Sequence, residues 1–177
     1  MIIMGIDLGI ARTGIAISDS QEEFAFPKTV IKEYNTEKLV GKIAELSVEY
    51  GAQMIVVGLP KNMDGSLGER AQTCTEIAEK IRTATGLFVD MYDERCTTME
   101  AYNLLDINDT YGKKRKESVD AVAATVILEG YLMLRKNNKK LFETQKQTLD
   151  TFLSTKAITE EQYNKSLNGL KEKMHIL

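Results

Sequence analysis

Apolar residues recur along this chain with strand-like and helix-like spacing, in an order that predicts a mixed α/β domain. Residues 54–57, MIVV, form a continuous apolar run, which is typical of a strand buried on both faces and predicts helices on both sides of the sheet. Pro27 limits strand pairing, so the strand that contains it is expected at a sheet edge. Apolar runs and turn residues together predict strands at residues 1–9, 13–20, 24–31, 54–57 and 87–92.

Segments whose apolar residues have helical spacing alternate with the later predicted strands. Thr36 and Ser118 are typical N-cap residues, and Gly51 and Gly86 are typical residues at a helix end. Residues 106–116 have no periodicity and are expected to form a loop. The predicted helices cover residues 36–50, 69–85, 97–105 and 118–134. Three strands followed by βα units predict a sheet whose first strands are antiparallel and whose later strands are parallel, with helices on its faces.

The composition changes after Leu134, where the chain becomes polar and keeps only a narrow apolar stripe. We therefore predict a main domain at residues 1–137 and a C-terminal helical hairpin at residues 138–177. Thr159 and Gln162 have the spacing of a capping box, which predicts the start of the second helix of the hairpin. Such a hairpin is too small to hold a core alone, so it must pack on the domain, on a second copy in a homodimer, or on a partner.

Composition excludes several classes of protein. The chain is 43% hydrophobic and 28% charged, as in an ordinary globular protein, and it has neither a membrane-spanning run nor an export signal. We therefore expect a cytoplasmic protein that makes no contact with a membrane. Cys74 and Cys96 fit no metal-ligand spacing and are expected to be small buried thiols. His175 is the only histidine and lies close to the C-terminus, which argues against histidine-based nucleophilic catalysis and zinc sites.

Charge is unevenly distributed along the sequence. The net charge is −3, but residues 107–140 contain eight basic and four acidic residues, a local charge of +4. This segment could meet a phosphate backbone, or it could be a solvated basic loop.

Three acidic residues stand out as possible ligands of a metal ion. Asp7 lies inside an apolar strand between Gly5 and Gly9, Glu94 follows a strand expected in the centre of the sheet, and Asp120 lies in the first turn of an apolar helix. If they converge, their oxygens suit divalent cations such as Mg²⁺, and two such ions can hydrolyse a phosphodiester without any histidine.

Each acid also has a simpler explanation. Asp7 could hydrogen-bond a turn, and Asp120 could stabilise a helix N-terminus. Glu94 could pair with Arg95 or cap the next helix.

Four blocks of sequence, in order, make the chain recognisable. They are GIDLG followed by RTGIAISD, then IVVGLPKNMDGS, then YDERCTT, then KESVDAVAATVILEGYL. Over residues 1–134 the chain resembles the YqgF family, also called RuvX-like or Holliday junction resolvases, whose members are described as nucleases that process the 5′ end of the 16S ribosomal RNA precursor. The resemblance implies a ribonuclease-H-like fold with a metal-dependent nuclease site.

The resemblance also assigns roles to residues. Asp7, Glu94 and Asp120 fall on the family's acidic positions, which implies that they are catalytic and bind Mg²⁺ or Mn²⁺, with two ions expected. The GLP-NMDG block is expected to form a wall of the site. The residues expected to contact the phosphates of nucleic acid are Arg12, Arg95, Lys113, Lys114, Arg115 and Lys116.

The favoured function is hydrolysis of phosphodiester bonds in structured nucleic acid, with precursor 16S ribosomal RNA as the expected substrate. One alternative is a Holliday junction resolvase that acts on branched DNA. A second is a non-catalytic RNA-binding module. A third, an actin-like ATPase, shares the glycine turn after the first strand but needs two such domains, for which the chain is too short.

Overall fold

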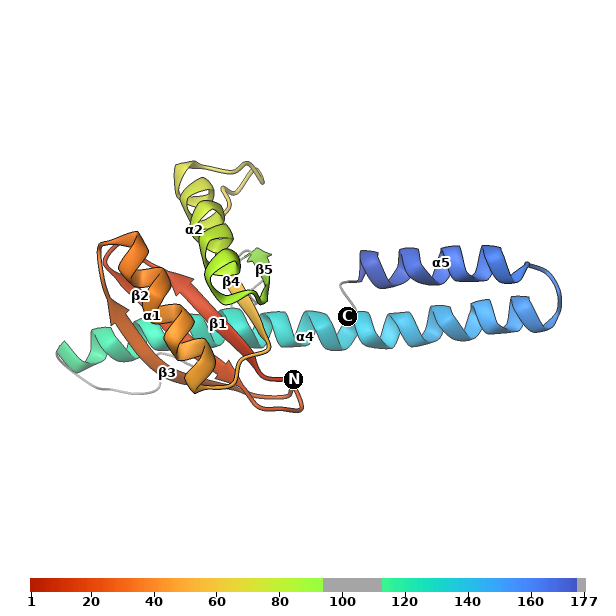
Figure 1. Ribbon diagram of the computed structural model, residues 1–177, viewed down its shortest axis with the longest axis horizontal. Coiled ribbons are helices and arrows are strands. Elements are labelled where there is room, and N and C mark those ends of the chain that lie inside the picture. Colours follow the sequence, from red (N-terminus) through yellow and green to blue (C-terminus); the bar gives the residue numbers. More distant parts are fainter. Residues whose placement is uncertain (94–112, 175–177) are drawn as a thin grey trace. The chain divides into compact units, whose positions relative to one another are not determined.

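The computed structural model describes the backbone of residues 1–93 and 113–174 and the side chains of residues 1–93 and 121–174. Within this part of the chain, five strands form one sheet in the order β3-β2-β1-β4-β5 (Figure 1). Strands β1, β2 and β3 are antiparallel neighbours, and β4 is parallel to both β1 and β5. This is the predicted mixed sheet, and its strands are β1 (Ile3–Leu8), β2 (Arg12–Ser18), β3 (Ala25–Lys32), β4 (Met54–Leu59) and β5 (Phe88–Asp93).

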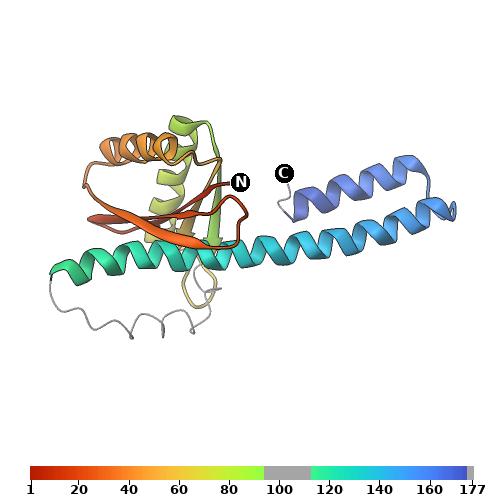
Figure 2. The ribbon, with the colours of Figure 1, turned by 90° about the horizontal axis from the view of Figure 1, so that it is seen from below.

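Helices cover both faces of the sheet. Helices α1 (Thr36–Glu49) and α2 (Glu69–Thr85) lie on one face, and the first part of α4 (Lys113–Ser154) lies on the other (Figure 2). Every residue of β4 is buried between these layers, as the continuous apolar run predicted. β3, which contains Pro27, is an edge strand, as predicted.

The ends of the first two helices follow local side-chain chemistry. α1 is capped by Asn35, whose side-chain oxygen accepts the Lys38 N–H at 2.9 Å, so the predicted cap at Thr36 was wrong by one residue. α2 has the predicted bounds. It ends at Gly86, whose φ of +68° is a conformation that glycine adopts without strain.

Helix α4 differs from the prediction at both ends. It begins at Lys113, so residues 113–116, which were expected in a loop, are helical. Lysine, arginine and glutamate are good helix formers, and this propensity outweighs the missing apolar periodicity. No proline follows, and the helix continues past Leu134 to Ser154, so the first arm of the predicted hairpin is the continuation of α4. The predicted helix at residues 97–105 lies outside the described residues.

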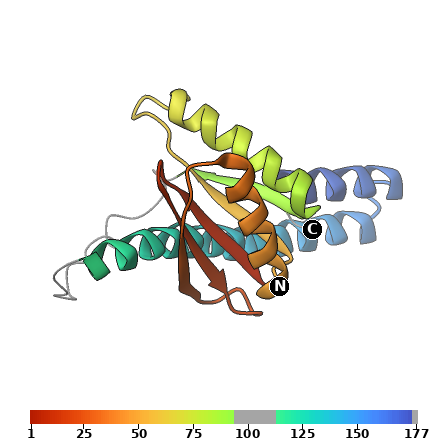
Figure 3. The same ribbon diagram turned by 60° about the vertical axis from the view of Figure 1, so that its left-hand side comes forward.

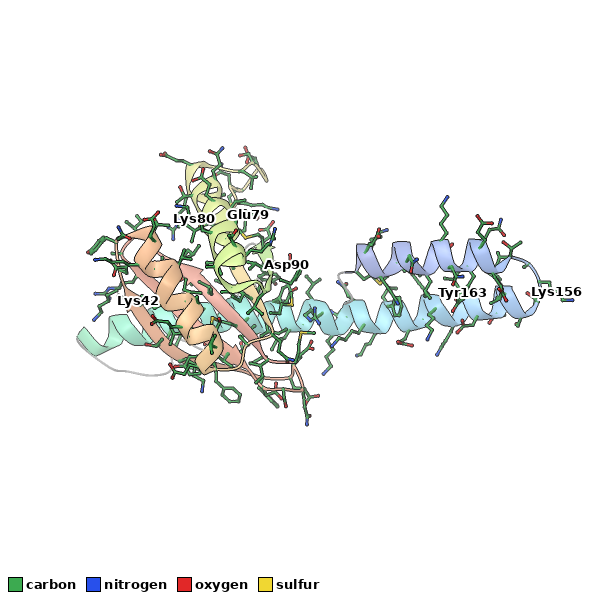
Figure 4. The ribbon with its side chains drawn as sticks, viewed as in Figure 1. Lys42, Glu79, Lys80, Asp90, Lys156 and Tyr163 are labelled. Carbon is green, nitrogen blue, oxygen red and sulfur yellow. The ribbon has the colours of Figure 1, made fainter. Side chains whose placement is uncertain are left out.

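The chain divides into two compact units, Met1–Tyr131 and Leu132–Leu177. In the second unit, α4 pairs with α5 (Glu160–Lys173), which starts with the predicted capping box at Thr159. The Tyr163 hydroxyl donates a 2.6 Å hydrogen bond to the Asp150 carboxylate between the two helices (Figure 4). Among the described residues, none of the helices is long and apolar enough to cross a membrane.

Two further predictions concern the first unit. The strand that precedes Glu94, β5, was expected in the centre of the sheet, and this prediction was wrong. In the described sheet β4 lies between β1 and β5, and β5 is the last strand. Cys74 on α2 is buried, as predicted, and it packs in the core between the helices α1 and α2 and the sheet. Cys96 lies outside the described residues.

Candidate metal centre at the carboxyl edge of the sheet

Asp7 lies near the carboxyl end of β1, the middle strand of the sheet. It is half-buried and pairs with Gly14 on β2. Side chains alternate along a strand, and Ile6 and Leu8 belong to the core beneath α1 and α2. Asp7 therefore belongs to the opposite face, together with Gly5, and this is the face that α4 covers.

Helix α4 packs closely on β1 at Gly5. A Cβ atom added to Gly5 would lie 2.7 Å from Leu128 Cβ and 3.1 Å from the Ala124 carbonyl oxygen, so this approach requires a glycine. β1 and the first part of α4 run in opposite directions (Figures 1 and 3). The helical turn before Ala124 therefore lies toward Asp7. Asp120 is four residues before Ala124, about one turn of the helix, and its side chain lies outside the described residues.

Glu94, the third predicted ligand, directly follows the last residue of β5 and lies outside the described residues. Parallel pairing places the carboxyl ends of β1, β4 and β5 at the same edge of the sheet. β5 lies two strands from β1, about 10 Å away, so Glu94 and Asp7 are not on neighbouring strands. No three acidic, histidine or cysteine residues among those described are grouped as a metal site. Convergence of Asp7, Glu94 and Asp120 therefore stays a prediction.

Two basic residues at this edge, Lys61 and Arg70, were not among the residues that the sequence predicted for the site. Lys61 Nζ lies 3.2 Å from Asp93 Oδ2, which ties the chain after β4 to the end of β5. Arg70, in the first turn of α2, donates from Nη2 to the Leu8 carbonyl oxygen at 3.4 Å. The second contact spans 62 residues of sequence. The only local signal was proximity in sequence, because Lys61 lies inside the GLP-NMDG block and Arg70 follows shortly after it.

That loop, expected as a wall of the site, is held by its own polar groups. The Asp64 carboxylate accepts the Ser66 N–H at 2.9 Å and the Ser66 hydroxyl at 2.6 Å, and Asn62 Nδ2 donates to Ser66 Oγ at 2.9 Å. Gly65 turns the chain with a φ of +87°. The loop therefore presents a defined surface beside the carboxyl end of β4.

The residues predicted to bind nucleic acid are placed only in part. Arg12 is the first residue of β2, and its carbonyl oxygen accepts the Gly9 N–H at 3.0 Å, which closes the turn after β1 at the carboxyl edge. The backbone of residues 113–116 belongs to α4, but the side chains of Lys113, Lys114, Arg115 and Lys116 lie outside the described residues, as does Arg95.

A cavity of about 410 Å³ opens at the same edge on the other face of the sheet. Its apolar lining includes Leu8 and Cys74, and its polar lining includes Glu33 and Arg70. A side-chain hydrogen bond from Lys42 lowers the pKa of Glu33, which keeps this carboxylate charged. Because Asp7 lies on the α4 face and does not line the cavity, the cavity is separate from the predicted metal site.

The arrangement defines an α/β domain with an acidic residue on the middle strand of a mixed sheet and a helix packed directly over that strand. The structure of T. thermophilus RuvC in complex with a Holliday junction substrate has the same fold, with a TM-score of 0.52 and 13% sequence identity over 76% of this chain and 96% of that one. The predicted ribonuclease-H-like fold is thus confirmed.

The sequence comparisons identify the family. The profile of the RuvX family, described as Holliday junction resolvase, matches residues 1–134. Proteins of Bacillus cytotoxicus and Bacillus thuringiensis, each named "Putative pre-16S rRNA nuclease", are 43% identical over 134 residues, which cover 75% of this chain and 98% of theirs. The chain belongs to the RuvX family, as its motifs predicted, and the enzyme class is nuclease.

Proposed function

We propose that this protein is a metal-dependent endonuclease of the cytoplasm that cleaves structured nucleic acid, with precursor 16S ribosomal RNA as its substrate. The supporting observation is the close packing of α4 on Gly5, which places Asp7 and the helical turn of Asp120 on one face, at one end of the sheet. The names of the Bacillus relatives favour ribosomal RNA as the substrate.

The residues fit a site for Mg²⁺ or Mn²⁺. Asp7, Glu94 and Asp120 offer only carboxylate oxygens, which hard divalent cations prefer. Asp7 is held by a strand that pairs on both sides, so its backbone is fixed before any ion binds. When bound, one or two such ions would activate water and stabilise the leaving oxygen of a phosphodiester.

The remaining side chains would position the substrate. Arg12, at the turn after β1, lies at the same edge as Asp7, and we assign it a contact with a phosphate. We assign the same role to Arg95 and to the basic residues at the start of α4, Lys113, Lys114, Arg115 and Lys116. Contacts with phosphates orient a nucleic acid without reading its sequence, so recognition would depend on the shape of the RNA.

The decisive experiment incubates the protein with precursor 16S ribosomal RNA and with a four-way DNA junction, each with Mn²⁺ and with EDTA. We expect cleavage of the RNA in Mn²⁺, none in EDTA, and none by Asp7→Asn or Asp120→Asn. Glu45→Gln is the matched control, because it removes an exposed carboxylate from α1 on the opposite face. Full activity of Asp7→Asn would contradict the metal assignment.

Binding of metal can be measured without activity. Mn²⁺ that binds only the folded state raises the unfolding temperature. We expect this rise in wild type and in Glu45→Gln, and a smaller rise in Asp7→Asn. An equal rise in all three proteins would place the ion elsewhere.

Branched DNA is the second candidate substrate, because the description of the matched family is Holliday junction resolvase. Metal-dependent cleavage of the junction, without cleavage of the RNA, would favour it. Binding of RNA that Asp7→Asn leaves intact, with no cleavage of either substrate, would favour the non-catalytic module.

We further propose residues 1–137 as the nuclease domain and residues 138–177 as a separable extension. The family profile ends at residue 134, and the Bacillus relatives match over 98% of their own length without the last quarter of this chain. A chain truncated after residue 137 is expected to remain folded, as measured by urea unfolding. An unfolded product would refute this division.

A further inference from the structure

The second unit of the chain, Leu132–Leu177, has little core of its own. Its two helices, α4 and α5, lie side by side as a hairpin (Figure 1). The structure describes every residue of α5 and none of them is buried, so the apolar side chains of Tyr163, Leu167 and Leu170 are only half-buried. Two helices that bury so little apolar surface are stabilised when a further surface covers them.

The part of α4 that belongs to the hairpin exposes large apolar side chains along one line. Leu134, Leu141 and Phe152 are 44%, 48% and 46% exposed. At about 100° per residue, these three side chains and that of Gln145 project within about 20° of one direction. We call these four residues the hairpin stripe. Large apolar side chains exposed together on one helix face indicate a contact surface.

The face of α4 around the hairpin stripe carries no charge. Between Leu134 and Phe152, the residues that project within about 80° of the stripe are neither acidic nor basic. The charged residues of this segment all project at about 100° or more from the stripe, and they are Arg135, Lys136, Lys139, Lys140, Glu143, Lys146 and Asp150. A face without charge does not suit a phosphate backbone, and it suits a surface that is equally uncharged, such as a second copy of itself.

Gln145 lies within the hairpin stripe and has an unsatisfied polar atom. Its side-chain oxygen Oε1 is buried and has no hydrogen-bond partner among the described residues. Buried amide oxygens in folded proteins nearly always accept a hydrogen bond. The side chain as a whole is half-buried, so a change of rotamer can turn the amide toward a surface that covers the stripe. The atom therefore indicates that this surface offers a donor.

The hairpin stripe is complementary to itself when two copies of α4 run antiparallel. A two-fold axis at the level of residue 143 sets Leu134 against Phe152 of the partner subunit, and Leu141 against Gln145 of the partner subunit. Gln145 is then two residues from the axis, so the amides of the two copies lie only about 6 Å apart along the helices. Each amide has both a donor and an acceptor, so the two can pair with each other.

The available area agrees with an interface between two hairpins. From Leu134 to Phe152, α4 is about 27 Å long, and two helices side by side are about 20 Å wide. Each hairpin thus offers a face of roughly 500 Å², and two such faces bury roughly 1,000 Å², which is the smallest area expected of a specific interface.

We propose that two copies of this chain associate through the hairpin stripe and form an antiparallel bundle of four helices, two from each copy. Such bundles are a stable solution for amphipathic hairpins. The paired Gln145 amides fix the register, as single polar residues do in other helical interfaces. The proposal concerns residues beyond the match to the family profile, which ends at residue 134, and it does not depend on the nuclease function.

Sedimentation equilibrium of the full chain measures the association. We expect wild type to have twice the mass of one chain at about 10 to 100 μM, which corresponds to a micromolar Kd. Leu141→Glu should raise this Kd by about a hundredfold or more, because the two-fold axis brings the new charge into the interface twice. Leu141 is half-exposed and glutamate is a good helix former, so the variant should stay folded, as urea unfolding will measure.

The matched control is Val48→Glu, which makes a similar change at a side chain that is 82% exposed on α1. Its Kd should equal that of wild type. A wild type that is monomeric at about 100 μM would overturn the proposal, as would equal values of Kd for the two variants.

Disulfide cross-linking tests the register without adding a charge. L134C/F152C should form disulfide-linked dimers on oxidation, because the antiparallel pairing sets these two positions of different chains against each other. Within one chain the two positions are about 27 Å apart and cannot be bridged. The single variants L134C and F152C should stay unlinked. All three carry Cys96→Ser, and the other native thiol, Cys74, is buried. Equal cross-linking of the single variants would overturn the antiparallel arrangement.

Discussion

Lys61 Nζ lies 3.2 Å from Asp93 Oδ2, and this ion pair joins the chain two residues after β4 to the last residue of β5. The two side chains are 28% and 17% exposed, and an ion pair so close to solvent stabilises a fold by only about 0.2–1 kcal/mol. Its more important effect is positional, because Asp93 directly precedes Glu94, one of the three predicted metal ligands.

Lys61→Met is expected to reduce the cleavage rate strongly and the stability of the fold only slightly. The free energy of unfolding should fall by less than about 1 kcal/mol. The rate of metal-dependent cleavage should fall by about ten- to a hundredfold, because small displacements of a catalytic group are costly. Cleavage at saturating Mn²⁺ and urea unfolding measure the two effects.

The matched control is Lys80→Met. Lys80 on α2 pairs with Glu37 on α1, also at 3.2 Å, on the face of the sheet opposite Asp7 (Figure 4). Its cleavage rate should equal that of wild type. A similar loss of rate in both variants would show that the Lys61 pair has no specific role at the site.

Gly5→Ala tests whether the packing of α4 on β1 forms the site. The added Cβ would lie 2.7 Å from Leu128 Cβ, so the helix must shift, at a cost of about 1–3 kcal/mol in the free energy of unfolding. Because Asp120 belongs to this helix, the cleavage rate should fall as well. Urea unfolding and cleavage assays on the same preparation measure both quantities.

Gly41→Ala provides the comparison, since a Cβ at this position in α1 would have no neighbour within 4 Å. Alanine is a better helix former than glycine, so this variant should be more stable than wild type by about 0.5–1 kcal/mol, with an unchanged cleavage rate. If Gly5→Ala were as stable as Gly41→Ala, the close packing of α4 on β1 would be contradicted.

The sequence predicted those elements whose ends are fixed by local chemistry. Helix α2 has its predicted bounds because glycines flank it, and the apolar run of β4 identified a strand covered on both faces. The sequence predicted helices both before and after residue 137, but it gave no signal that the two form one uninterrupted helix.

The sequence singled out the acidic residues of the candidate site but none of the contacts around them. Asp7 stood out because a carboxylate is unusual in an apolar strand. The contact between Arg70 and the Leu8 carbonyl oxygen joins residues that no local pattern connects, and the position of β5 at the edge depends on strand order. Such long-range relations arise from the assembled sheet and have no signature in spacing.

Tyr131→Phe tests a polar contact between α4 and the sheet. The Tyr131 hydroxyl donates a 2.7 Å hydrogen bond to Asp90 Oδ2, and the ring makes an edge contact with Tyr92 at 6.0 Å between centroids. Phenylalanine keeps the ring contact and removes only the hydroxyl. The free energy of unfolding should therefore fall by about 1–3 kcal/mol, because a half-buried carboxylate loses one of its hydrogen-bond donors while it keeps the Met91 N–H.

Urea unfolding provides the measurement. Tyr34→Phe, at a side chain that is 82% exposed, should unfold at the wild-type urea concentration. Identical midpoints for Tyr131→Phe and Tyr34→Phe would show that the hydrogen bond to Asp90 does not stabilise the fold.

Asp19 makes the stability of the turn between β2 and β3 depend on pH. Its carboxylate accepts the N–H groups of Phe24 at 3.0 Å and Glu23 at 2.7 Å, and these backbone hydrogen bonds, with that of Phe24 the largest cause, lower the pKa of Asp19. A lowered pKa in the folded state means that the charged form stabilises the fold. This contribution is fully present above the ordinary aspartate value of about 3.9 and is lost as the pH falls through the lower pKa of the folded state.

Asp19→Asn should accordingly be less stable than wild type at pH 7 and at pH 5, because the amide has one acceptor oxygen and no charge. Below the ordinary aspartate pKa, the two proteins should approach the same stability as wild-type Asp19 becomes protonated. Urea midpoints measured for both proteins at pH 7, 5, 3.5 and 2.5, or about these values, cover the window. A difference that stayed constant down to the lowest pH would mean that the charge of Asp19 does not hold the turn.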